Sequence, residues 1–360
     1  MSDVDEATAL SASECEQRCS HFVEATKTDA ACAHFYLQDN GWNLERAVSA
    51  FLDAVVESVD SDSDSNTGSS KPKKPRIDVD FPIAPSAIDD SGAGDSSLLE
   101  FSVLSWNIDG LNSANLASRT QAVIDEIKLS AHDVIFLQEV VADSLSRLRG
   151  QLETDFLFLL GTETGNSQFS SAAHYFTAML LRKQTVTLLS HSCAPYENTV
   201  MARNLLEAQV TIANEPLALL TSHLESCKEN SVQRTAQLKQ CFARMNAIGD
   251  QLCKPVIFGG DLNVRNAEVG QLDGGIVDLW DVCGRPSSAQ YTWDCLRNDN
   301  LSVGDGKFKP RARYDRLYWK PQPRFPFRPT GFGLVGQERI RSCLAFPSDH
   351  WGIVCKFVRK

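Results

Sequence analysis

Short runs of apolar, β-branched and aromatic residues recur from residue 99 to the end of the chain. They read FSVLSW (101–106), DVIFLQ (133–138), FLFLL (156–160), FTAMLL (176–181), NLLEAQVTI (204–212), LALLTSHL (217–224), PVIFGGDLN (255–263), DRLYW (315–319) and WGIVCKFV (351–358). Such runs are typical of β-strands, whereas residues 118–130 and 229–252 have the apolar spacing of helices. The short gaps within residues 176–224 favour antiparallel hairpins. The pattern predicts an α+β fold, a four-layered α/β sandwich in which two packed mixed sheets carry outer helices.

A separate helical block precedes this region. Three helices fit its pattern, at about residues 11–25, 29–39 and 43–56. Asp29 and Asn43 stand where helix N-caps belong, and Gly41 stands where a helix ends. Apolar residues of all three segments, Phe22 and Trp42 among them, could fill one small core. We therefore expect a small three-helix domain over residues 1–57.

Residues 58–98 have the composition of a linker. The stretch SDSDSNTGSS is polar and of low complexity, and Pro, Gly and Ser stay frequent up to Ser97. Such a segment buries too little apolar area to offset the entropy lost on ordering, so we expect a disordered linker. The basic cluster KPKKPR, Lys71 to Arg76, has the composition of a nuclear-import signal, with a solvated charge run as the alternative. A large α/β domain over residues 99–360 completes the expected organisation.

Net charge is unevenly distributed along the chain. The whole sequence carries −11 at pH 7. Residues 1–98 hold 7 basic and 19 acidic side chains, a balance of −12, whereas residues 99–360 hold 28 basic and 27 acidic, a balance of +1. A near-neutral domain can still contain a local basic groove, so the charge neither supports nor excludes a DNA partner.

Two further features of composition concern the compartment. No apolar run reaches the ~18 residues needed to span a bilayer, and the acidic N-terminus lacks the apolar core of a secretory signal. The 11 cysteines are scattered without paired metal-ligand spacing. We therefore expect free thiols in a reducing compartment and no membrane partner.

Polar residues recur just past the ends of the apolar runs, where a rigid sheet can hold functional groups accurately. These positions are Asn107, Glu139, His223, Asp261, Asn263, Asp315, Asp349 and His350. Any one of them could be a cap or a turn residue. Their recurrence in one chain predicts a shared site, and their residue types suit the cleavage of a phosphodiester.

Phosphodiester cleavage needs a hard cation and a base. Mg²⁺ prefers one or two carboxylates plus water, and Glu139 is the predicted ligand. Asp261 is the predicted base that takes a proton from the attacking water.

The reaction also needs donors for the charge that develops on the phosphate oxygens. His350, Asn263 and Asn107 could supply them. A carboxylate behind the imidazole of His350 would hold its tautomer and keep it charged. Either Asp315 or Asp349 could take that place.

Motifs around these positions carry a resemblance that covers the whole of residues 99–360. SWN (105–107), LQEV (137–140), TSHLES (221–226), GGDLNVR (259–265), YTWD (291–294), YDRL (314–317) and PSDHWG (347–352) resemble, in this order, the motifs of the endonuclease/exonuclease/phosphatase superfamily. The longer strings HLES, RNLL (203–206), YFTAMLL (175–181), QYTWD and FPSDHWG are similar to its tyrosyl-DNA phosphodiesterases. The resemblance implies that residues 99–360 form the catalytic domain of such an enzyme.

The resemblance implies a role for each matching residue. Glu139 would bind Mg²⁺, with Mn²⁺ as an alternative. The catalytic group would comprise Asp261, which activates water, Asn263 beside it, Asn107 near metal and phosphate, and His350 with Asp315 as its partner. The residues expected to contact phosphate or DNA are His223, Ser226, Trp293, Arg203 and Tyr175.

The N-terminal block carries a second resemblance. The run FYLQDNGWNLERAVSAFL (35–52) resembles the second half of a ubiquitin-associated domain, and the similarity extends over about 45 residues. It implies ubiquitin as a partner. A helical bundle with no ubiquitin role is the alternative.

Together the two resemblances imply a DNA-repair enzyme, and the basic cluster favours a nuclear location, with the cytoplasm as a second one. It would hydrolyse 5′-phosphotyrosyl bonds that trapped topoisomerase II leaves on DNA, prefer single-stranded 5′ ends and release a topoisomerase-derived peptide. One alternative is a related phosphodiesterase or phosphatase acting on abasic DNA, RNA or inositol phosphates. The other is a non-catalytic ubiquitin-binding adaptor, which the presence of every expected catalytic residue type disfavours.

Overall fold

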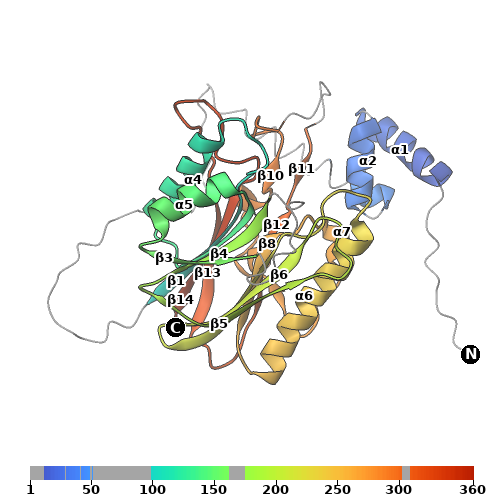
Figure 1. Ribbon diagram of the computed structural model, residues 1–360. Helices are drawn as coiled ribbons and strands as arrows, with labels where there is room; N and C mark the ends of the chain where they lie inside the picture. The colour runs from blue at the N-terminus through green and yellow to red at the C-terminus, as the bar shows by residue number, and fades with distance from the viewer. Residues whose placement is uncertain are drawn as a thin grey trace, which may run out of the picture. The chain divides into compact units, whose positions relative to one another are not determined.

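The computed structural model describes residues 12–28, 30–40, 42–48, 51, 99–161, 175–301 and 309–360 (Figure 1). The chain divides into two compact units, one N-terminal and one that contains residues 99–301 and 309–360. In the described part of the chain, no helix is both long and apolar enough to cross a membrane.

The N-terminal unit is helical. It contains α1 (Ala12–Thr26), α2 (Ala30–Asp39) and helical residues at 44–48 and 51. Phe22 is fully buried, and its ring lies 5.9 Å from that of Tyr36 and 5.7 Å from that of Phe51. This small helical region agrees with the prediction, because the aromatic side chains supply most of the area that so short a unit can bury.

The predicted details of this unit are only partly covered. The Asn43 Oδ1 atom accepts a hydrogen bond from the Arg46 backbone amide at 2.9 Å, as an N-cap side chain does. Asp29, Gly41, most of the predicted third helix beyond residue 48 and the basic cluster of residues 71–76 lie outside the described residues. The boundaries at residues 57 and 98 therefore stay predictions.

The larger unit contains two six-stranded mixed sheets. The first has the order β13-β14-β1-β2-β4-β3, from β13 (Phe327–Val335), β14 (Gly352–Arg359), β1 (Glu100–Asn107), β2 (Val134–Val140), β4 (Phe176–Arg182) and β3 (Phe156–Leu160). The second has the order β5-β6-β7-β8-β12-β9, from β5 (Val186–Pro195), β6 (Asn204–Ile212), β7 (Glu215–Ser222), β8 (Val256–Asp261), β12 (Asp315–Lys320) and β9 (Val277–Asp278). Each sheet has one parallel pair, β1–β2 or β7–β8, and its other neighbours are antiparallel.

Helices cover the outer faces of both sheets (Figure 1). The main ones are α4 (Leu116–Ser130), α5 (Ala142–Leu152) and α6 (Ser231–Gln251). The shorter elements are α7 (Asn266–Val269), α8 (Leu279–Val282), the 3-10 helix η1 (Ser287–Ala289) and the ribbon of β10 (Trp293–Asp294) with β11 (Arg311–Ala312). The helix α4 connects β1 to β2, and α6 connects β7 to β8, as a parallel pair requires.

Three apolar clusters hold these layers together. Side chains of α4 and α5 pack on the outer face of the first sheet, and those of α6 pack on the second. The third cluster fills the space between the sheets, where the stacked rings of Phe101 and Phe357 lie 4.7 Å apart and Trp319 contacts Phe357 at 5.4 Å. Full burial of each such side chain contributes roughly 1.5–3 kcal/mol. The predicted four-layered sandwich is confirmed.

Candidate active site

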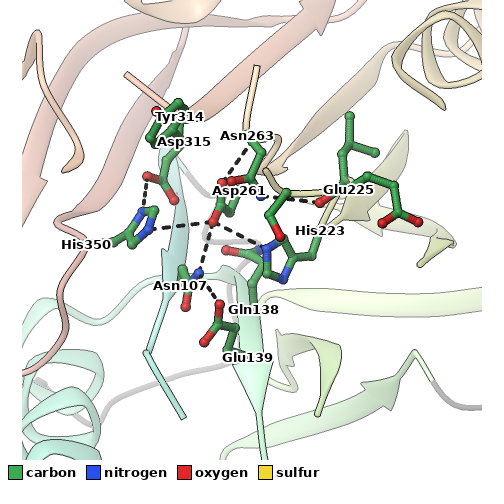
Figure 2. Close-up of polar contacts among 12 residues, drawn as sticks. Asn107, Gln138, Glu139, His223, Glu225, Asp261, Asn263, Tyr314, Asp315 and His350 are labelled. Carbon is green, nitrogen blue, oxygen red and sulfur yellow. Dashed lines mark hydrogen bonds and ion pairs between the residues drawn. The ribbon is translucent and has the colours of Figure 1, made fainter. Parts of the chain in front are cut away.

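The Asp261 carboxylate lies at the centre of a polar network where the two sheets meet (Figure 2). Its Oδ2 atom accepts from Asn107 Nδ2 at 2.9 Å and lies 3.5 Å from His223 Nε2 and 3.7 Å from His350 Nε2. Its Oδ1 atom accepts from the Asn263 amide at 3.0 Å. Asn107 ends β1 in one sheet and Asp261 ends β8 in the other. Both sheets therefore contribute residues to the site.

Backbone conformation at the strand ends brings these groups together. Glu139 and Asn263 have the left-handed φ values of 55° and 53°, which non-glycine residues rarely adopt. Gly260, directly before Asp261, has φ 148°, and a Cβ atom there would lie 1.9 Å from the Ser222 carbonyl oxygen. Such strain persists only where the surrounding structure enforces it, and it is frequent at active sites.

The electrostatics of the centre favour an ionised Asp261 between two different imidazoles. Burial alone would raise the pKa of Asp261, but the neighbouring His350 cation and the hydrogen bond from Asn107 lower it below its ordinary value. Burial lowers the pKa of His223 well below its ordinary value, and Arg203 acts in the same direction. His223 is therefore neutral at physiological pH, and Asp261 remains an anion.

His350 has the opposite character. Burial disfavours its charged form, yet the carboxylates of Asp315, Asp261 and Asp349 raise its pKa well above the ordinary value. Its Nδ1 atom lies 2.8 Å from Asp315 Oδ2, a hydrogen bond that fixes the ring. Geometry thus resolves the choice between Asp315 and Asp349 as the partner of Nδ1 in favour of Asp315.

Glu139 lies on the β2 side of the network. Its Oε1 atom accepts from Asn107 Nδ2 at 3.1 Å, so one amide group bridges Glu139 and Asp261. Burial raises the pKa of Glu139 to about 7, and the charge on Asp349 acts in the same direction. Burial and a like charge both disfavour the Glu139 carboxylate. A bound cation would stabilise it.

Two sets of residues could hold a metal ion. Asp261, Asp315 and His350 offer ligand atoms that all lie within 4.8 Å of one another. A metal ion there would have to replace the 2.8 Å hydrogen bond between His350 and Asp315. Glu139, with the Asn107 amide beside it, is half-buried and keeps a second carboxylate oxygen for an ion. The acidic surroundings of Glu139 therefore fit a hard divalent cation without that loss.

Two aromatic walls flank Asp261 on different sides. On one side the Arg203 guanidinium lies over the Tyr175 ring, 5.1 Å from its centroid, and that ring lies 6.2 Å from His223. On the other, Trp293 pairs with His350 through an isolated β-bridge. Trp293 and His350 line a cleft of about 200 Å³ together with Cys227, Lys228, Arg234, Asn263, Arg265 and Tyr314.

The structure therefore brings most of the predicted residues together. Ser226 differs from the others, because its hydroxyl donates to the sulfur of Met201 at 3.2 Å. Three supporting residues were not predicted. Thr292 accepts from the Asp315 amide at 3.1 Å, Ser348 donates to the Asn107 carbonyl at 2.6 Å, and Glu225 contacts the segment around residue 200. All three lie inside the motif strings, but a residue type within a motif does not reveal which atom it contacts.

Comparison with known proteins agrees with this geometry. The model of the endonuclease/exonuclease/phosphatase family matches residues 104–350. The chain belongs to this family. A UBA-like domain model matches residues 16–57, so the family's catalytic domain follows a UBA-like domain here.

Named relatives narrow the place of the chain within the family. Tyrosyl-DNA phosphodiesterase 2 of Xenopus tropicalis is 34% identical over 98% of this chain and 95% of its own length. The 5′-tyrosyl-DNA phosphodiesterase of Caenorhabditis briggsae is 33% identical over 95% and 90%. A crystal structure of Danio rerio TDP2 with a single-stranded DNA product covers 72% of this chain and 98% of that one, with 37% identity and a TM-score of 0.65. The chain is a homologue of tyrosyl-DNA phosphodiesterase 2 over nearly its whole length.

Proposed function

We propose that this protein hydrolyses 5′-phosphotyrosyl bonds in DNA and leaves a free 5′ phosphate. One observation carries the proposal: relatives named for this activity match the chain almost from end to end. The site geometry supports it, because the side chains that the reaction needs converge on Asp261. The substrate would be a DNA end to which trapped topoisomerase II remains attached through tyrosine, and the released product a topoisomerase-derived peptide.

The proposed cofactor is Mg²⁺, with Mn²⁺ as the alternative, held by Glu139 with Asn107 beside it. When bound, the cation would neutralise phosphate charge and stabilise the leaving oxygen. Glu139 has to be ionised to bind it, and burial opposes that state. Metal affinity should therefore depend on the protonation of Glu139.

Asp261 would orient the attacking water and accept its proton. Its lowered pKa keeps it ionised, and the Asn107 amide and the Asn263 backbone fix both of its oxygens. Because Asn107 donates to Glu139 as well, the base and the metal ligand keep a constant separation. Such preorganisation lowers the entropy that must be lost during the reaction.

His350 would meet the phosphate as a cation. Its Nδ1 proton is directed to Asp315, whereas its Nε2 atom lies 3.7 Å from Asp261, beyond normal hydrogen-bond distance. That Nε2 proton is therefore available to a phosphate oxygen. A phenol has a pKa of about 10, so the tyrosine oxygen leaves without the strong protonation that a sugar alkoxide needs.

The two walls suit a DNA end with an aromatic adduct. Bases that stack on aromatic side chains gain ~1–3 kcal/mol each, and the cleft beside Trp293 contains the cations Lys228 and Arg265. Arg203 and Tyr175 offer a cationic and aromatic surface on the other side of Asp261. We propose a preference for single-stranded 5′ ends, as the DNA product in the Danio rerio structure is single-stranded.

Two further proposals concern the N-terminal part. The UBA-like domain would bind ubiquitin. The cluster Lys71 to Arg76 would direct the protein to the nucleus, with a second pool in the cytoplasm.

A substrate panel tests the proposed activity. Purified protein is incubated with a 5′-phosphotyrosyl single strand, an abasic duplex, an RNA strand and an inositol polyphosphate, each with Mg²⁺ or with a chelator. We expect metal-dependent release of tyrosine and little incision of abasic duplex. Strong incision of the abasic duplex without tyrosine release would instead make the protein an abasic endonuclease.

A further inference from the structure

Glu225 is a fully buried acidic residue with no role in the reaction described above. It follows β7, two residues after His223. Its Oε1 atom accepts hydrogen bonds from Thr199 Oγ1 at 2.6 Å, from the Val200 amide at 2.8 Å and from the Met201 amide at 3.2 Å. All three donors belong to the connection between β5 and β6, residues 196–203, which we call the arch.

The arch carries Arg203 at its end. Thr199 Oγ1 accepts from the Arg203 amide at 2.7 Å, and the Tyr196 amide donates to the Arg203 carbonyl at 3.1 Å. Thr199 therefore links the Glu225 carboxyl directly to the backbone of Arg203. Because the Arg203 guanidinium lies over the Tyr175 ring, the shape of the arch sets the position of that wall.

Glu225 is also tied to the catalytic centre. The neighbouring Leu224 donates its amide to the Asp261 carbonyl at 3.1 Å and accepts from Asn263 Nδ2 at 3.2 Å. From α6, Gln237 Oε1 accepts from the Glu225 amide at 3.0 Å and Arg234 Nη1 donates to the Glu225 carbonyl at 3.0 Å. The backbone at Glu225 is thus fixed to Asp261 and α6, while its side chain holds the arch.

We propose that Glu225 is a positioning residue that sets the Arg203–Tyr175 wall at a fixed distance from Asp261. Burying a carboxyl group costs free energy unless its oxygens meet donors. The Glu225 Oε1 atom meets the three arch donors and, at 3.4 Å, Gln237 Nε2, whereas Oε2 is buried without a hydrogen-bond partner among the described residues. The neutral amide of glutamine accepts more weakly than a carboxylate does. The inference rests on the proposed function in so far as the wall is taken to contact the DNA end or its tyrosine.

A double-mutant cycle tests the proposal. Glu225→Gln should lower kcat/KM for a 5′-phosphotyrosyl oligonucleotide by about tenfold or more, towards the ~10²-fold that a 1 Å misplacement typically costs. The loss should be much smaller on a small aryl phosphodiester that does not reach the wall. In an Arg203→Ala background, Glu225→Gln should cost less than about twofold, because the group that it positions is gone. Additive losses would overturn the proposal.

Two further variants separate positioning from a general loss of folding. Thr199 is only partly buried, and Thr199→Val removes the link between Glu225 and Arg203 at constant shape. It should reproduce the substrate-dependent loss in a protein that still unfolds in one cooperative transition. The control is Glu207→Gln, which removes another buried carboxylate that pairs with Arg244 and makes none of the arch hydrogen bonds described above. It should change stability without distinguishing between the two substrates, and equal behaviour of Glu207→Gln and Glu225→Gln would contradict the role.

Amide hydrogen exchange makes the test independent of the proposed activity. In Glu225→Gln the amides of Val200, Met201 and Arg203 should exchange at least about tenfold faster, while those in β8 keep wild-type protection. Wild-type protein that releases no tyrosine would disprove the proposed function, and arch exchange would still decide whether Glu225 holds the arch. Unchanged exchange at these three amides would overturn the inference even in an active enzyme.

Discussion

Glu139 and Asp261 at the centre of the site have different proposed roles, as metal ligand and as base. Glu139→Gln and Asp261→Asn should each lower turnover by about 10²-fold or more, because loss of a metal ligand or a base typically costs several kcal/mol of transition-state stabilisation. Glu139→Gln should leave the melting temperature at or above that of wild type, since burial disfavours the carboxylate that it removes. Single-turnover rates and calorimetry measure both effects. Near-wild-type turnover of either variant would refute the assignment.

The His350–Asp315 pair predicts strong coupling between two substitutions. If Asp315 acts by holding His350 charged and oriented, Asp315→Asn acts through His350. The double variant should then be little slower than His350→Ala alone, within a factor of about 2. Rates of the two single variants and the double variant at saturating substrate give the answer. If the losses in rate of the two single variants multiplied in the double variant, Asp315 and His350 would act independently.

The sequence predicted which residues converge but not how they are arranged. Asn107, Glu139, Asp261 and His350 were found because a polar residue directly after an apolar strand has few structural reasons to recur. Tyr175 and Trp293 were both predicted to contact phosphate or DNA, without a position relative to the catalytic residues. The structure places Tyr175 beside His223, and Trp293 pairs with His350. Their positions depend on how loops fold over the strand ends, which no local pattern encodes.

At the scale of elements, the β1–α4 connection is pressed against the end of β2. A Cβ atom on Gly110 would lie 2.0 Å from the Glu139 carbonyl oxygen and 3.3 Å from a Val141 methyl group. Gly110→Ala should therefore destabilise the protein by ~1–3 kcal/mol and weaken metal binding by displacing Glu139.

Gly150 supplies the matched control for that substitution. It lies in α5 and has no heavy atom within 4 Å of an added Cβ. Gly150→Ala should stabilise the protein by about 0.5–1 kcal/mol, as expected in a helix. Urea unfolding and metal titration of both variants measure the contrast. The steric explanation would be wrong if Gly110→Ala bound metal like wild type.

The segment just before β2 contains a buried histidine, His132, that makes stability depend on pH. Burial lowers the pKa of His132 to about 4, with the nearby Arg182 acting in the same direction. Between pH 6.5 and 4 the unfolded chain therefore binds more protons at His132 than the folded protein does. The contribution of neutral His132 to the free energy of unfolding is complete above pH 6.5 and is lost as the pH falls. Between pH 7 and 5 the loss should be about 2 kcal/mol.

The variant His132→Asn isolates that contribution. An asparagine can still meet the Ser102 hydroxyl, which lies 3.0 Å from His132 Nδ1, but it does not titrate. Urea unfolding at pH 7 and pH 5 should show a smaller pH effect in the variant than in wild type by about 2 kcal/mol. Equal pH effects in both proteins would rule out His132 as the titrating group.

Elements with a regular apolar pattern were predicted, and irregular ones were not. The strands β1, β2 and β8 and the helix α6 have uninterrupted patterns. The strand β13 contains Pro329, Gly331 and Gly333, and its register with β14 shifts between Pro329 and Gly331. Its pairing with β14 stabilises β13 in spite of a weak local β propensity. A sequence pattern does not show such a long-range pairing. The polar helix α5, with Asp143 in its first turn, was missed because only one narrow face is buried.

For the whole molecule, removal of residues 1–98 should leave catalysis intact. The deletion removes the −12 segment and no strand of either sheet. Turnover of the truncated protein on a phosphotyrosyl oligonucleotide should lie within about twofold of full length, whereas ubiquitin binding and nuclear enrichment should fall. Affinity measurements and microscopy of a fluorescent fusion check the last two. Loss of catalysis would make the N-terminal part a component of the site.

The pairing of β1 with β14 has a consequence for biosynthesis. Glu100 pairs with Val358, so β1 cannot pair with β14 until another 258 residues have been synthesised. At roughly 5–20 residues per second, translation leaves that edge of β1 open for about 13–50 s. His350 is made just before β14, so a nascent chain lacks both this central strand and the imidazole that is proposed to meet the phosphate. Until β14 is made, the unpaired N–H and C=O groups along this edge of β1 are where a chaperone on the ribosome would be needed.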